Sequence, residues 1–172
     1  MESFDYSSNG MYFITLCTTQ HKQILSQVVG TGVPDGPRIY LSEYGVVADN
    51  QIKIMSDFYD DLKVLKYVIM PNHIHLLLQV CNDNGPSGMP VHTDNRNSVV
   101  SKFIGTFKRF CNKQYGQNIW QSRSFDRVIR TEEEYKKIWN YIESNPSKWS
   151  EDKYNNGPSG MPVPTEKGDN NG

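Results

Sequence analysis

The chain has 172 residues and a formal net charge of −1, with 37% apolar and 22% charged residues. These values are typical of one soluble globular domain with a modest core. No stretch approaches the roughly 18 apolar residues of a membrane span, and the N-terminus lacks the basic and apolar blocks of a signal peptide. The sequence therefore predicts a cytoplasmic protein with no membrane partner.

The cysteines also indicate a reducing compartment. Cys17, Cys81 and Cys111 are odd in number and far apart in the chain. Their spacing matches neither a set of zinc ligands nor a disulfide framework, so we expect three free thiols.

The first half of the chain predicts a strand, a helix and a hairpin. Residues 11–18 are rich in β-branched and aromatic side chains, and residues 41–58 repeat apolar side chains at helical spacing after the potential cap Ser42. Residues 62–70 and 73–80 then read as two strands separated by two residues. Such a short connection predicts an antiparallel hairpin.

The second half predicts helix, strand and helix. Residues 98–114 carry an apolar stripe and end before Gly116, and residues 124–130 are a plausible strand. Thr131 and Glu134 match a capping box, with the threonine capping the next helix and the glutamate reaching back. Pro146 must end or bend that helix.

The order of these elements is β-α-β-β-α-β followed by one more helix, which predicts an α+β, ferredoxin-like antiparallel sheet with an extra C-terminal helix. We expect one domain over residues 1–149, with Gly/Pro-rich insert loops near 30–38 and 82–97. Residues 150–172 are expected to form a disordered Gly/Pro-rich tail.

The inserts and the tail share a repeat. Residues 84–91 and 156–163 both read NGPSGMPV, and residues 31–37 read TGVPDGP. A DNA word close to one that encodes the first motif can encode the second when it is reverse-complemented in a shifted frame. We infer that one DNA element occurs three times in the gene, once inverted, and the nucleotide sequence of the gene tests this hypothesis.

Basic residues gather in one part of the nearly neutral chain. Between residues 101 and 130 a single acid, Asp126, accompanies seven basic residues: Lys102, Lys108, Arg109, Lys113, Arg123, Arg127 and Arg130. Such a cluster can hold a phosphate backbone, and it can equally be a solvated face. Trp120 and Gln121 precede the arginines; an aromatic ring there suits base stacking or, equally, a core anchor.

Two pairs of residues could carry chemistry. His73 and His75 alternate with Ile74, so on a strand both point to one face, where two imidazoles can bind one divalent ion or serve only structural roles. Tyr141 and Asn145 are four residues apart, hence on one face of the last helix. The phenol is a potential nucleophile and the amide a potential metal ligand, although Tyr141 also borders an apolar stripe.

Together these segments resemble one family. YVIMPNHIHLLL (residues 67–78) resembles the histidine-hydrophobe-histidine motif of single-tyrosine transposases. NIWQSRSFDRVIRTEEEYKKIWNYIESNPSKW (residues 118–149) resembles the C-terminal signature of the REP-associated tyrosine transposases, bacterial relatives of larger insertion-sequence transposases. The resemblance spans roughly residues 11–149, interrupted by the inserts.

The resemblance implies a metal-dependent enzyme that nicks and joins single-stranded DNA. His73 and His75 would bind Mg²⁺ or Mn²⁺ with Asn145 as the third ligand, and Tyr141 would form a 5′-phosphotyrosine intermediate. The substrate would be hairpin-forming repetitive palindromic DNA, bound in the nucleoid of a bacterium by a monomer or homodimer. The alternatives are a transposase-derived protein that binds DNA hairpins without cleaving them, a replication or conjugation nickase of the same superfamily, and a ferredoxin-like RNA-binding module, which would need exposed aromatic residues on its sheet.

Overall fold

The computed structural model describes residues 10–30, 36–81 and 93–155, with only the backbone described for 93–98. Its strands are β1 (Gly10–Cys17), β2 (Ser26–Val29), β3 (Arg38–Leu41), β4 (Leu62–Ile69), β5 (His73–Val80) and β6 (Phe125–Ile129). Its α-helices are α1 (Glu43–Phe58), α2 (Thr93–Tyr115) and α3 (Glu132–Ser144). Short 3₁₀ helices occupy Thr19–His21 and Pro146–Glu151.

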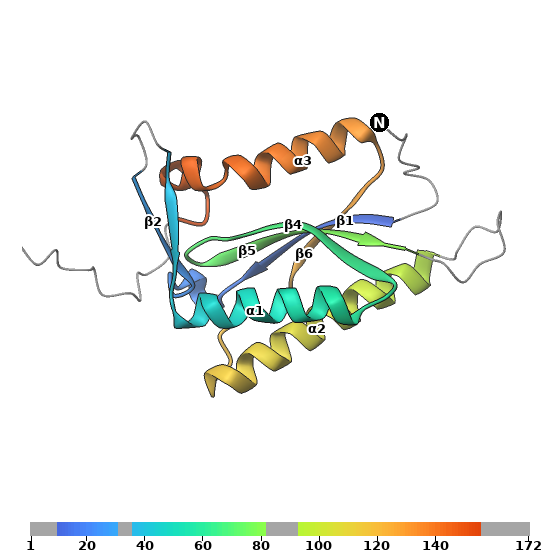
Figure 1. Cartoon of the computed structure of the whole chain (residues 1–172), viewed down its shortest axis with the longest axis horizontal. Coiled ribbons are helices and arrows are strands. Elements are labelled where there is room, and N and C mark those ends of the chain that lie inside the picture. Colours follow the sequence, from blue (N-terminus) through green and yellow to red (C-terminus); the bar gives the residue numbers. More distant parts are fainter. Residues whose placement is uncertain (1–9, 31–35, 82–92, 156–172) are drawn as a thin grey trace, which may run out of the picture.

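Four strands form the main sheet in the order β4-β5-β1-β6, and every neighbouring pair is antiparallel. Helices α1 and α2 cover one face of this sheet, and α3 covers the other (Figure 1). In the first β-α-β unit, α1 connects β1 to β4 across β5. In the second, α2 connects β5 to β6 across β1. The predicted α+β fold with the ferredoxin-like order and an extra helix is therefore confirmed.

The central strand β5 is buried on both faces, and its residues divide between two clusters. Ile74, Leu76 and Leu78 join the larger core beneath α1 and α2, while Leu77 joins a smaller cluster beneath α3. This division follows from the period of two along a strand. It places His73 and His75, which share a face with Leu77, on the α3 side of the sheet.

Side-chain caps begin two of the helices where the sequence predicts them. The hydroxyl of Ser42 accepts a hydrogen bond from the backbone N–H of Gly45 at 3.1 Å, and the hydroxyl of Thr131 accepts one from Glu134 at 3.2 Å. The carboxylate of Glu134, however, accepts from the backbone N–H of Arg130 at 3.0 Å, one residue before the cap. The guanidinium of Arg127, 2.6 Å away, holds the carboxylate toward β6 and accounts for this shift.

Other boundaries differ from the expected ones. Strands β2 and β3 pair with each other on either side of residues 31–35, a hairpin that the sequence analysis did not predict because both strands are short. Helix α2 begins at Thr93, inside the expected insert loop at 82–97. The described structure continues to residue 155, six residues beyond the expected domain boundary. The NGPSGMPV repeats and most of the TGVPDGP segment lie outside the described residues.

The three cysteines are free thiols, as predicted, with Cys17 and Cys111 buried and Cys81 partly exposed. Among the described residues, no helix combines the length and apolar character that crossing a bilayer requires.

The space around Gly45 of α1 and Gly105 of α2 shows how tightly each helix is packed at that position. A Cβ atom at Gly45 would lie 2.0 Å from the backbone oxygen of Leu25, whereas a Cβ at Gly105 would meet nothing within 4 Å. We predict that Gly45→Ala lowers the free energy of unfolding by roughly 1–3 kcal/mol, because the Leu25 backbone must move. Gly105→Ala should raise it by about 1 kcal/mol, since alanine favours the helix.

Urea unfolding followed by circular dichroism measures both changes. Equal effects of the two substitutions would contradict the close approach of α1 to Leu25.

Candidate active site

The histidine pair lies on β5, on the face that α3 covers. His73 is 0% exposed and His75 1%, and their ring centroids are 4.5 Å apart. The intervening Ile74 points into the opposite core. The same-face arrangement expected from the His-x-His spacing is therefore present in the structure.

A hydrogen bond orients each ring through its Nδ1 atom. Nδ1 of His73 lies 2.9 Å from Oδ1 of Asn72, and Nδ1 of His75 lies 2.9 Å from the hydroxyl oxygen of Thr15 on β1. The amide group of Asn72 donates to the carbonyls of His21 and Tyr154, which fixes Oδ1 as the atom facing His73. Because that oxygen only accepts, His73 donates through Nδ1 and its Nε2 carries a free lone pair.

The His21 carbonyl belongs to the turn before β2, and the backbone of this turn has an unfavourable conformation. Gln20 and His21 both have positive φ angles, of 57° and 52°. Each such non-glycine residue costs on the order of 1 kcal/mol. The strained turn brings the His21 carbonyl to Asn72 and so helps to hold the amide that orients His73.

Both imidazoles are neutral near pH 7. Burial lowers the pKa of His75 to about 3, with a smaller contribution from Lys153. Burial also lowers the pKa of His73 well below its ordinary value, and the neighbouring His75 adds to the effect. The neutral imidazole is the form that binds a metal ion.

Helix α3 brings Tyr141 and Asn145 to the same place. Ile138 and Ile142 dock the helix on the cluster that contains Phe13, and this fixes its rotation. The ring centroid of Tyr141 lies 5.2 Å from that of His75 and meets Phe13 edge-on at 5.9 Å. Tyr141 is 39% exposed, whereas Asn145 is 2% exposed. A phenol that a ligand can reach thus stands beside a buried amide and the histidine pair.

Three buried atoms of this group have no hydrogen-bond partner among the described residues: Nε2 of His73, Nε2 of His75 and Oδ1 of Asn145. Leaving such groups unpaired costs free energy, so a ligand that accepts their lone pairs would stabilise the site. A divalent cation fits this donor set of two nitrogens and one oxygen. Within the described part of the chain, no group of three His, Cys, Asp or Glu side chains could hold a metal ion.

The segment that follows α3 contributes residues that the sequence analysis missed. An oxygen of Asp152 lies 3.9 Å from Nε2 of His73, and the ring of Tyr154 lies 4.7 Å from that of His73. The backbone of this segment is held by hydrogen bonds from Asn72 to Tyr154 and from Gln23 to Asn155. The signal in the sequence was the charged and aromatic stretch EDKY, which precedes the Gly/Pro repeat.

The environment of Tyr141 makes its phenol a weaker acid than usual. Its pKa is raised, mainly by burial and secondly by the carboxylate of Asp152, while the side chain of Asn145 acts in the opposite direction. A nucleophilic role therefore requires help in removing the proton.

Eight residues of the stretch 102–130 are expected to bind DNA: Lys102, Lys108, Arg109, Trp120, Gln121, Arg123, Arg127 and Arg130. They do not form one surface. Lys102, Arg109, Arg123 and Arg130 are exposed, whereas Trp120 is 2% exposed and packs against Phe107, the alternative of a core anchor. Lys108 donates to the backbone oxygens of Gln121 and Ser122 at 2.7 and 3.3 Å.

The other two of the eight residues, Gln121 and Arg127, lie nearer the candidate site. The side-chain amide of Gln121 donates to the backbone oxygen of Thr18 at 3.1 Å, and its nitrogen is 3.3 Å from Nε2 of His21. Arg127 forms an ion pair with Glu134 of α3, on the side of the sheet that carries the histidines. The basic cluster of the sequence is thus divided between the two faces of the sheet.

The chain is similar to known proteins in sequence and in fold. No family model matches the chain. An uncharacterised protein of Haemophilus influenzae is 22% identical over 165 residues, which cover 88% of each chain.

A solved structure shares the arrangement of elements. It is the structure of a REP-associated tyrosine transposase bound to a REP hairpin, and it matches with a TM-score of 0.55 and 19% sequence identity. The match covers 86% of this chain and 74% of the other. The chain therefore has the fold of a REP-associated tyrosine transposase.

Proposed function

We propose that this protein is a transposase-like enzyme that cleaves and rejoins single-stranded DNA, with Tyr141 as the nucleophile and a divalent metal ion as cofactor. The observation that carries the proposal is the convergence of three buried, unpartnered donor atoms beside a tyrosine that remains accessible. Two of the donors come from β5 and the third from the C-cap of α3, and one bound metal ion would account for all three unpaired atoms at once.

His73, His75 and Asn145 are the residues that would hold the ion, and Asp152 offers a carboxylate oxygen next to His73. Mg²⁺ or Mn²⁺ suits a site that combines imidazole with oxygen ligands. When bound, such an ion supplies Lewis-acid chemistry: it polarises a phosphate oxygen and offsets the negative charge that develops on the phosphoryl group.

The chain's own residues perform the displacement. The phenolic oxygen of Tyr141 attacks the phosphorus, the bond from phosphorus to the 3′-oxygen breaks, and a 5′-phosphotyrosine link forms. The phenol loses a proton and the departing 3′-oxygen gains one. The reverse attack by a 3′-hydroxyl releases Tyr141 and joins strands without ATP. The rings of His75 and Phe13 flank the phenol and limit its orientations.

The proposed substrate is hairpin-forming single-stranded DNA. The structural relative is bound to a REP hairpin, and the exposed basic residues of α2 and β6 suit a phosphate backbone. The repeats NGPSGMPV and TGVPDGP suggest that the gene itself contains a hairpin-forming element, which gives a first oligonucleotide to test. We propose action at the bacterial nucleoid as a monomer or homodimer.

We predict that Tyr141→Phe abolishes cleavage. The unchanged protein, incubated with Mn²⁺ and a labelled oligonucleotide that carries the gene's repeat, should yield a shortened strand and a covalent protein–DNA adduct on a denaturing gel. The substitution should lower the rate by on the order of 10³-fold or more, because it removes the attacking oxygen.

Tyr135→Phe on the same helix is the matched control and should leave cleavage unchanged. Binding of the hairpin without any cleavage would identify a non-catalytic hairpin-binding protein instead. Cleavage of a strand that has no hairpin would favour a replication or conjugation nickase.

We also predict that Mn²⁺ stabilises the fold through the donor set. A ligand at about 100 times its dissociation constant adds about 2.7 kcal/mol to the stability of the state that binds it. For a chain of this size, this corresponds to a rise in melting temperature of roughly 5–10 °C. His75→Ala and Asn145→Ala should remove the rise, whereas Asn140→Ala, an exposed position on the same helix, should retain it.

Differential scanning calorimetry with Mn²⁺ and with chelator measures the rise for each variant against its own metal-free state. A rise that survives both His75→Ala and Asn145→Ala would show that the ion binds elsewhere.

A further inference from the structure

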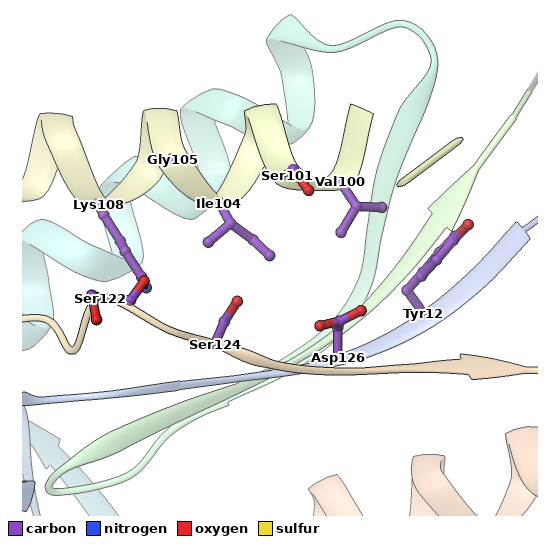
Figure 2. Close-up of a pocket in the computed structure, with 9 residues that line it drawn as sticks. All are labelled: Tyr12, Val100, Ser101, Ile104, Gly105, Lys108, Ser122, Ser124 and Asp126. Carbon is purple, nitrogen blue, oxygen red and sulfur yellow. The ribbon is translucent and has the colours of Figure 1, made fainter. Parts of the chain in front are cut away.

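A pocket of about 400 Å³ lies on the opposite side of the sheet from the candidate active site, between α2 and β6. Figure 2 shows Ile104, Gly105 and Lys108 on the helix, facing Ser122, Ser124 and Asp126 on the chain that enters and forms β6. This volume is within the range of small-ligand sites, roughly 300–1,000 Å³.

The two faces of β6 separate the pocket from the candidate active site. Ile14, a residue of the larger core, is the partner of Asp126 across the β1–β6 pair, so Asp126 points toward α2. Phe125 and Arg127 point to the other face, where Thr15, the partner of Phe125, bonds to His75. Because β6 is an edge strand, a DNA strand can pass over it and reach both faces.

The pocket has opposite charges at its two ends. Lys108 is partly buried, and two of its three N–H groups are used by the carbonyls of Gln121 and Ser122. Asp126 is exposed and forms no ion pair or hydrogen bond with other described residues. A simple anion would be repelled by Asp126 and a simple cation by Lys108. A ligand that presents an anionic acceptor toward Lys108 and a hydrogen-bond donor toward Asp126 would suit both ends.

Gly105 keeps one side of the pocket open. A glycine within a helix lowers helix stability relative to alanine, and here neither a positive φ angle nor close packing explains it, since a Cβ would meet nothing within 4 Å. The missing side chain leaves room beside Ile104, whose apolar surface can cover the flat face of a ring.

We propose that this pocket binds one unpaired nucleotide of the DNA strand, with its phosphate toward Lys108 and a base bearing an exocyclic amino group toward Asp126. A carboxylate accepts well from the amino group of cytosine, whereas thymine has no such group. Ser124 lies between the two ends and Ser122 lies beside Lys108, so their hydroxyls can bond to the base or the phosphate (Figure 2). The inference rests on the proposed single-stranded DNA substrate, and it assigns to the chain a recognition site apart from Tyr141.

Fluorescence anisotropy with short labelled oligonucleotides of deoxycytidine or thymidine, in the presence of chelator, tests the proposal on the full chain. The unchanged protein should bind the deoxycytidine strand roughly 5- to 100-fold more tightly than the thymidine strand. Asp126→Asn should bring this ratio close to one, because an amide can pair with either base. Gly105→Leu should weaken binding of the deoxycytidine strand by about 10-fold or more, since it fills the pocket.

Gln114→Leu, at an exposed position of α2 that does not line the pocket, is the control for folding and should bind as the unchanged protein does. Unchanged affinity and base preference in Gly105→Leu and Asp126→Asn, with DNA still cleaved, would overturn the pocket and leave the proposed enzyme intact. Weaker binding by Gly105→Leu and loss of base preference in Asp126→Asn, with no cleavage by the unchanged protein, would support the pocket and refute the catalytic proposal. A protein that binds neither oligonucleotide would overturn the pocket directly.

Discussion

The structure depends on the pairing of β5 between β1 and β4. Thr15 and Val68 stand on either side of His75 in this register, and the hydroxyl of Thr15 holds the imidazole. Since side chains alternate along a strand, a slip of one residue would turn both histidines into the apolar core and expose Ile74 to α3. The apolar residues on the α1 and α2 side of β5 resist such a slip, so the hydrophobic core sets the position of the polar site.

The site is completed by segments that lie far apart in the chain. Helix α3 packs on the second face of the sheet through Ile138 and Ile142, and this packing directs Asn145 toward the histidines. The segment after α3 then folds back, so that Asp152 and Tyr154 stand beside His73. A large apolar core on the other face compensates for the cost of the buried polar atoms, which helps to explain why the site and the main core occupy opposite faces.

The edge strand β6 contributes residues to both the proposed active-site face and the proposed nucleotide pocket. Its alternation presents Arg127 to the face of Tyr141 and Asp126 to the pocket beneath α2. Most of the strand is exposed, although an exposed edge is a risk for aggregation. Charged side chains on both faces of β6 reduce this risk and also suit contact with a phosphate backbone. Under the two proposals, this one strand would position DNA for recognition on one face and for chemistry on the other.

The order of the elements, the caps at Ser42 and Thr131 and the shared face of His73 and His75 followed from the sequence alone, because local periodicity and capping chemistry determine them. The sequence also identified Tyr141 and Asn145 as neighbours on one helical face. It left open whether Trp120 stacks on bases or anchors the core, and it did not reveal Asp152 or the pocket below α2. Only the tertiary structure decided these points, because burial, the docking of α3 and the return of the chain to His73 depend on contacts between residues far apart in the sequence.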